Sequence, residues 1–260
     1  MNVPGELIVR APLGDWPIDK DIAEVLDFQA LYRSSLRWYG IFQDKYFIKI
    51  LPERTEILEK ELRMMLLAGD CSVNPVGRVF TKGQLCGFLT FRQQPITAPH
   101  AAWETAKVSS DLTRAERLQL IDEFCSLLGR LHKKGIIHGD VKPSNLLRCS
   151  DGSLRFCDFA ESFVDGKSGP PRASTAQYLS PYMIRANPLP TMAKTEDLYA
   201  AGVTIWEICT GKIPFEEVDE EDLEDVIGQG AQPDLSLIDD PDVAEQIKTY
   251  LNMGNRLSCN

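Results

Sequence analysis

The chain lacks the features that mark membrane, secreted and zinc-binding proteins. No stretch approaches the roughly 18 apolar residues that a membrane-spanning helix needs, so we expect no membrane segment. The N-terminus has no basic start followed by an apolar run, so we expect no secretory signal. The seven cysteines are scattered, odd in number and never spaced as Cys-x-x-Cys, which argues against a disulfide scaffold and a zinc site. These absences predict an intracellular protein, cytoplasmic or nuclear, in a reducing compartment.

An excess of basic residues is also absent. The formal net charge is −10 and the isoelectric point is near 4.9. This balance argues against nucleic acid as the main partner, because binding to phosphate backbones needs a basic surface. A basic protein substrate is compatible with the charge.

The pattern of apolar residues divides the chain into a strand-rich first third and a mostly helical remainder. Apolar spacing of three and four residues predicts a helix over 53–68. Thr113 and Glu116 form a capping box that predicts the start of another helix. We expect short strands within 21–52 and over 76–80 and 85–91.

These elements predict an α+β fold of two lobes. With 260 residues and 43% hydrophobic content, the chain can bury a substantial core. We expect a small β-rich lobe over about 21–90 and a larger helical lobe over about 94–260, which together form a single domain spanning 1–260.

Two short strings carry the chemistry. The string HGDVKPSN occupies 138–145, and DFA occupies 158–160 after a predicted strand. Together they supply an acid near a hydroxyl, a lysine near a phosphate and two metal-binding oxygens, which indicates a phosphoryl-transfer site. Ordinary polar residues in a loop are the alternative, but the order of helix, loop and strand around them disfavours it.

The strings resemble the H-R-D-x-x-x-x-N and D-F-G motifs of protein kinases. The string STAQYLSP at 174–181 resembles the end of a kinase activation segment. The string DLYAAGVTIWE at 197–207 resembles the buried central helix of the large lobe, and TGKIPF at 210–215 the turn after it. The resemblance covers about 21–227 and implies a bilobal protein-kinase-like fold.

The resemblance implies a role for each polar residue. Asp140 would be the catalytic base that accepts or orients the proton of the attacking hydroxyl, and Lys142 would steady the γ-phosphate of ATP. Asn145 and Asp158 would offer oxygens to Mg²⁺. In Ser/Thr-specific members, the residue equivalent to Thr175 touches the catalytic aspartate and lysine.

The remaining expected site residues lie in the small lobe and on the central helix. Lys49 would position the nucleotide phosphates, with Glu61 as its partner and Glu59 as the alternative. Asp197 would hold the backbone of the catalytic loop. The hinge that reads adenine falls within 89–92, and either Leu89 or Thr90 would guard the back of the pocket.

The small lobe departs from the kinase pattern at two places. No glycine occurs in 30–38, where a glycine-rich loop normally lets backbone amides approach phosphates; Arg33 and Arg37 could compensate by charge, or be exposed hairpin residues. Phe47 shares a strand face with Lys49, so its ring either stacks on adenine or fills the pocket.

The large lobe departs at three positions. Gly139 replaces the arginine that pairs with an activation-loop phosphate, so we expect no such switch at Ser168 or Ser174. Ala160 replaces glycine, a mild change beside the metal-binding aspartate. Tyr182 replaces a glutamate, which removes a buried ion pair and bears on stability rather than chemistry.

Three functions are consistent with these residues. The first is a Mg²⁺/ATP-dependent protein kinase that prefers Ser or Thr, with ATP and a protein substrate as partners and neither nucleic acid nor membrane. The second is a pseudokinase that binds partners through the same fold. The third is a small-molecule phosphotransferase of the aminoglycoside or choline kinase type, because those enzymes also use H-G-D. The sequence leaves the oligomeric state open.

Overall fold

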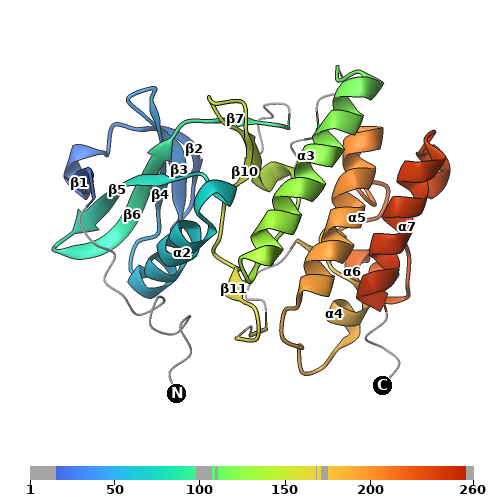
Figure 1. Cartoon of the computed structure of the whole chain (residues 1–260). Helices are drawn as coiled ribbons and strands as arrows, with labels where there is room; N and C mark the ends of the chain where they lie inside the picture. The colour runs from blue at the N-terminus through green and yellow to red at the C-terminus, as the bar shows by residue number, and fades with distance from the viewer. Residues whose placement is uncertain (1–15, 98–106, 109–110, 168, 171–174, 256–260) are drawn as a thin grey trace. The chain divides into compact units, whose positions relative to one another are not determined.

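The computed structural model describes residues 16–97, 107–108, 111–167, 169–170 and 175–255 (Figure 1). The mixture of sheet and helix confirms the expected α+β class. By its contacts the chain divides into two compact units, Met1–Gln94 with Leu147–Ala160, and Pro95–Leu146 with Glu161–Asn260. The first unit thus includes a segment from later in the chain than the expected lobe boundary near 90–94. The extent of the domain, 1–260, stays a prediction.

A six-stranded sheet in the order β1-β5-β6-β4-β3-β2 forms the body of the first unit. β1 pairs with β5 in parallel, and the other neighbours are antiparallel. The strands are β1 (Ile18–Asp21), β2 (Gln29–Arg33), β3 (Trp38–Phe42), β4 (Tyr46–Ile50), β5 (Pro75–Thr81) and β6 (Gln84–Phe91).

Alternation of side chains gives this sheet two different faces. On β4, Ile48 and Ile50 join a hydrophobic core that also contains Phe28 from the segment before β2. The intervening residues Phe47 and Lys49 lie on the opposite face. A Cβ atom on Gly40 would lie 2.2 Å from a carbon of the Phe28 ring, so glycine is needed for this packing.

Helix α2 (Thr55–Ala68) confirms the helix expected over 53–68. Its apolar face is buried in the first unit, and Glu61 lies within this buried stripe: Leu58, Glu61, Leu62, Met64, Met65 and Ala68. The later segment of the unit contains most of β9 (Leu146–Arg148) and all of β10 (Leu154–Phe156). The amide of Val73 donates to the Phe156 carbonyl at 2.9 Å, which ties β10 to the rest of the unit.

The second unit is mostly helical. The capping box expected at the start of α3 (Arg114–Lys133) is present: the Thr113 hydroxyl accepts from the Glu116 amide at 3.3 Å, and the Glu116 carboxylate accepts from the Thr113 amide at 2.8 Å. The other helices are α4 (Pro181–Arg185), α5 (Lys194–Thr210), α6 (Leu223–Gly228) and α7 (Pro241–Asn255). Its short pieces include β8 (Ile136–Ile137), β11 (Phe163–Val164), and the 3₁₀ turns η4 (Pro143–Asn145), η5 (Ala176–Tyr178) and η6 (Leu235–Leu237). Strand β7 (Gln94–Pro95) includes the last residue of the first unit and the first residue of the second.

Helix α5 is the core of this unit, as its apolar sequence predicts. It is buried along most of its length and packs beside α3 and α7 (Figure 1). Two glycines allow α7 to approach closely. A Cβ atom on Gly202 would lie 3.1 Å from Tyr250, and one on Gly254 would lie 2.8 Å from Tyr199.

Two further observations concern surface and membrane. The acidic run 216–222 precedes α6 and is almost entirely exposed to solvent. Within the described part of the chain, no helix has the length and apolar character to cross a membrane. Ser168, Ser174 and the N-terminal residues considered for a signal lie outside the described residues.

Candidate functional site

Lys49, Glu61 and Asp158 form a charged cluster within the first unit. The Lys49 Nζ lies 2.8 Å from Glu61 Oε1 and 2.9 Å from Asp158 Oδ1. Strand β4 supplies the lysine, helix α2 the glutamate, and the segment after β10 the aspartate. The pair expected from the sequence is therefore present. The alternative partner, Glu59, lies 3.2 Å from Arg63 instead.

The electrostatics of this cluster keep Lys49 charged. Burial opposes its charge, but the Asp158 and Glu61 carboxylates outweigh that effect, so the pKa of Lys49 lies well above its ordinary value. Burial raises the pKa of Glu61 to about 7, against the attraction of Lys49. The result is a fixed, desolvated ammonium group, the kind of group that binds the phosphates of a nucleotide.

The backbone around Asp158 explains why alanine is tolerated at Ala160. Asp158 has a φ of 57°, in the left-handed region that costs energy for a non-glycine residue, and the fully buried Phe159 ring anchors it. Ala160 itself has no such φ, so its methyl group adds no backbone strain. The Lys60 ammonium donates to the Ala160 carbonyl at 3.1 Å, which links this segment to α2.

An aromatic row runs along the sheet face that carries Lys49. Tyr39 lies directly opposite Lys49 in the β3–β4 register, and the Lys49 Nζ is 5.7 Å from its ring centroid. The Phe47 ring stacks on Tyr39 at a centroid distance of 6.2 Å, and Tyr32 follows at 5.9 Å. Phe47 thus shares the face of Lys49 as predicted. Sequence reasoning missed Tyr39, although the short β3–β4 hairpin gives a signal for its register.

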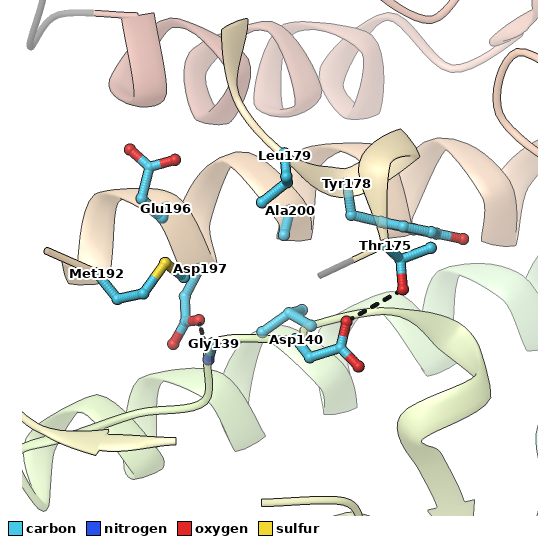
Figure 2. A pocket seen from close by; sticks show the side chains of 10 residues that line it. Gly139, Asp140, Thr175, Tyr178, Leu179, Met192, Glu196, Asp197 and Ala200 are labelled. Atoms are coloured by element: carbon cyan, nitrogen blue, oxygen red, sulfur yellow. Dashed lines mark hydrogen bonds between the residues drawn. The ribbon is translucent and has the colours of Figure 1, made fainter. Parts of the chain in front are cut away.

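The second unit holds the residues expected to act on the phosphate acceptor. The Lys142 Nζ lies 2.8 Å from Asp140 Oδ2 and donates to the Thr175 hydroxyl at 2.6 Å. The Thr175 hydroxyl donates to Asp140 Oδ1 at 3.3 Å (Figure 2). The three side chains form the triangle that the kinase resemblance implies.

Asn145 also holds Asp140 in place. Its amide nitrogen donates to the Asp140 carboxylate at 2.9 Å and to the Asp140 carbonyl at 2.8 Å, and the side chain is almost completely buried. Because the nitrogen faces Asp140, the amide oxygen is the atom that remains for a cation.

Asp197 fixes the backbone of the catalytic loop, as expected. Its carboxylate accepts from the amide of His138 at 2.7 Å. It also accepts from the amide of Gly139 at 2.9 Å (Figure 2). Gly139 has a φ of 80°, and a Cβ atom there would lie 2.4 Å from the Glu161 carbonyl oxygen. The loop therefore requires glycine at this position, which gives a physical reason for the loss of arginine.

Two buried acids near this loop were not found from the sequence. The Tyr178 hydroxyl donates to the Glu207 carboxylate, and burial raises the pKa of Glu207 to about 7. Glu196 is 3% exposed, and among the residues that the structure describes neither of its carboxylate oxygens has a hydrogen-bond partner. Burial raises its pKa to about 7 as well, partly offset by the nearby Ser180 hydroxyl. The only signal for these two acids in the sequence is their position on the helix α5, which is buried.

Tyr182 is partly buried in an apolar cluster with Ile137, Met183 and Met192. A charged glutamate at this position would need a cation beside it to offset its burial. The environment of Tyr182 therefore agrees with a change that affects packing rather than chemistry.

Comparison with known proteins identifies the family. The family model for the protein kinase domain matches residues 100–251, more than half of the chain. The chain belongs to the protein kinase family. The alternative assignment to the aminoglycoside or choline kinase type is thereby not favoured. Strands β1 to β6 and helix α2 of the first unit lie outside the matched range.

Kinase relatives come from bacteria, plants and animals. The probable serine/threonine-protein kinase PknB of Corynebacterium glutamicum is 37% identical over 110 residues, which are 40% of this chain and 17% of that protein. The probable serine/threonine-protein kinase pknA2 of Bifidobacterium longum is 28% identical over 169 residues, 64% of this chain and 22% of that protein. Serine/threonine-protein kinase AtPK1/AtPK6 of Arabidopsis thaliana is 34% identical over 95 residues, 36% of this chain and 20% of that protein. The matches thus span only about a fifth of these relatives.

Proposed function

We propose that this protein kinase domain transfers the γ-phosphate of ATP to Ser and Thr hydroxyls of proteins, with Asp140 as the catalytic base. The arrangement of Asp140, Lys142 and Thr175 carries the proposal. A carboxylate held in place by an ammonium group and a hydroxyl is oriented toward an incoming hydroxyl before the substrate binds.

In this proposal each residue of the triangle has one task. Asp140 accepts or orients the proton of the attacking hydroxyl. Lys142 stabilises the negative charge that develops on the transferred phosphate. Thr175 fixes the position of both side chains through its hydroxyl.

Mg²⁺ would be held through oxygen atoms of Asn145 and Asp158. The donor chemistry fits, because Mg²⁺ prefers oxygen ligands and needs few from the protein when phosphates supply the others. The Asp158 side chain is 40% exposed, so a hydrated cation can reach it. The metal would neutralise the charge of the triphosphate, and Lys49, held by Glu61, would position its phosphates.

A pseudokinase is the second candidate, and one observation favours it. Phe47 and Tyr39 stack on each other on the face of Lys49, where the nucleotide would lie. If the domain is a pseudokinase, these aromatic rings would fill the adenine position and the domain would act by binding a partner. The retention of Lys49, Asp140 and Asp158 supports the enzyme instead, because a binding module does not need these groups.

Transfer of γ-phosphate from Mg-ATP to a panel of proteins and small aminoalcohols distinguishes the candidates. We expect transfer to protein hydroxyls that is abolished in Asp140→Asn. The control is Asp151→Asn, which changes an exposed loop aspartate paired with Arg155. Transfer that is equal in all three proteins, or confined to aminoalcohols, would refute the proposal. Tight ATP binding without transfer would favour a pseudokinase.

A further inference from the structure

The hairpin between β2 and β3 stands where kinases carry the glycine-rich loop, but three of its backbone amides already donate hydrogen bonds within the turn. The Ser34 amide donates to the Arg37 carbonyl at 3.0 Å. The amides of Leu36 and Arg37 donate to the Ser34 hydroxyl at 3.3 and 3.2 Å. These amides are therefore unable to cradle phosphates, and no residue of the turn adopts the left-handed conformation that glycine favours.

The two arginines of this hairpin lie on opposite faces of the sheet. Arg33 is paired with Trp38 in the register, and its guanidinium lies 4.5 Å from the centroid of the Trp38 ring. Trp38 packs against the hydrophobic core, on the face away from Lys49. Arg37 directly precedes β3, and its guanidinium lies over the Tyr32 ring. Tyr32 is paired with Tyr39, and Tyr39 with Lys49, so Arg37 is on the face of Lys49.

The surroundings of Arg37 place its charge over the aromatic row. Its guanidinium lies 5.3 Å from the centroid of the Tyr32 ring, which lies 5.9 Å from the Tyr39 ring in a tilted arrangement. Partial desolvation opposes the charge, but the phenol groups of Tyr39 and Tyr32 outweigh it, so the pKa of Arg37 lies above its ordinary value. A positively charged group is thus held on the nucleotide face at the end of the hairpin.

We propose that Arg37 binds the triphosphate of the nucleotide in place of the missing backbone amides. The inference rests on the proposed function and adds a phosphate-binding residue to it. Two residues of strand span about 6.6 Å, and opposite residues of a pair lie about 5 Å apart, so the two long cationic side chains of Arg37 and Lys49 reach one polyphosphate. The planar guanidinium binds phosphate oxygens through two parallel hydrogen bonds.

Calorimetric titration of the full chain with adenosine, ADP and ATP in the presence of Mg²⁺ tests this role. In Arg37→Gln we expect ATP to bind about tenfold more weakly, the loss of roughly one charge-assisted hydrogen bond, while adenosine binds as in the wild type. Arg37→Lys keeps the positive charge but loses the planar guanidinium. Its ATP affinity should therefore lie between those of the wild type and Arg37→Gln. Arg33→Gln, the matched control on the opposite face, should leave both affinities within about twofold.

The outcomes separate this inference from the proposed function. If the wild type binds ATP and transfers phosphate while Arg37→Gln binds ATP equally well, the role of Arg37 is wrong and the function stands. The role is also wrong if Arg37→Gln loses adenosine and ATP affinity together, because the hairpin then acts through its shape. If the wild type binds none of the three ligands, the proposed function fails and the role of Arg37 fails with it.

Discussion

Replacing Gly139 by alanine tests whether the catalytic loop requires glycine for steric reasons. Gly135 provides a matched control in the same unit, since its φ of 72° is close to the 80° of Gly139. A Cβ atom on Gly135 would meet nothing within 4 Å, whereas one on Gly139 would lie 2.4 Å from the Glu161 carbonyl oxygen. Both variants therefore place alanine in the left-handed region, but only Gly139→Ala adds a steric clash.

The magnitudes follow from these two contributions. Alanine in the left-handed region costs about 1–2 kcal/mol, which we expect in both variants. Forcing a methyl group into a filled space typically adds about 1–3 kcal/mol, which we expect only at Gly139. Gly139→Ala should therefore be less stable than Gly135→Ala by about 2 kcal/mol, or about 4–8 °C in melting temperature.

The assay is thermal unfolding of the full chain followed by circular dichroism, with phosphate transfer measured on the same samples. The Gly139 amide donates to Asp197 at 2.9 Å and precedes Asp140, so a displaced loop should lower the transfer rate about 100-fold. Gly135→Ala should keep wild-type transfer. Equal melting temperatures for the two variants would refute the steric reasoning, as would wild-type transfer by Gly139→Ala.

Three further perturbations test other parts of the molecule. Phe47→Ala should change the ATP dissociation constant, because the ring lies on the face of Lys49; an unchanged constant in a titration would show that the nucleotide does not contact it. Glu196→Gln should raise stability at pH 8 by up to about 3 kcal/mol and leave it nearly unchanged at pH 5. The reason is that burial raises the pKa of Glu196 from 4.5 to about 7, so the acid contributes stability at low pH that is lost as pH rises through 7. The free energy of unfolding, measured with urea across pH 5–8, checks this. If it falls with pH as steeply in Glu196→Gln as in the wild type, the reasoning is contradicted. Glutamate substitution at Ser168 or Ser174 should leave the transfer rate within about twofold, because Gly139 offers no cation to the added charge; a severalfold increase would overturn that view.

Local patterns in the sequence were sufficient where a structural feature depends on neighbouring residues. Apolar spacing predicted α2, and the capping box of Thr113 and Glu116 predicted the start of α3. These features depend on contacts three or four residues apart, so a short window contains the cause. The pairing of Lys49 with Glu61 followed from the same spacing, since Glu61 is on the apolar stripe of its helix and Glu59 is not.

Tertiary structure alone decided the features that depend on strand register and on packing between distant segments. The register of β3 on β4 sets Tyr39 beside Lys49, and the hairpin sends Arg37 and Arg33 to opposite faces. The contact between Gly139 and the Glu161 carbonyl exists only in the folded chain. The sequence by itself thus determined the family, the α+β class and the identity of the charged groups, because these are encoded in residue type and short spacing. Which of these groups lie next to one another was decided by the fold. The reason is that the groups in contact are far apart in the sequence, so local spacing does not relate them.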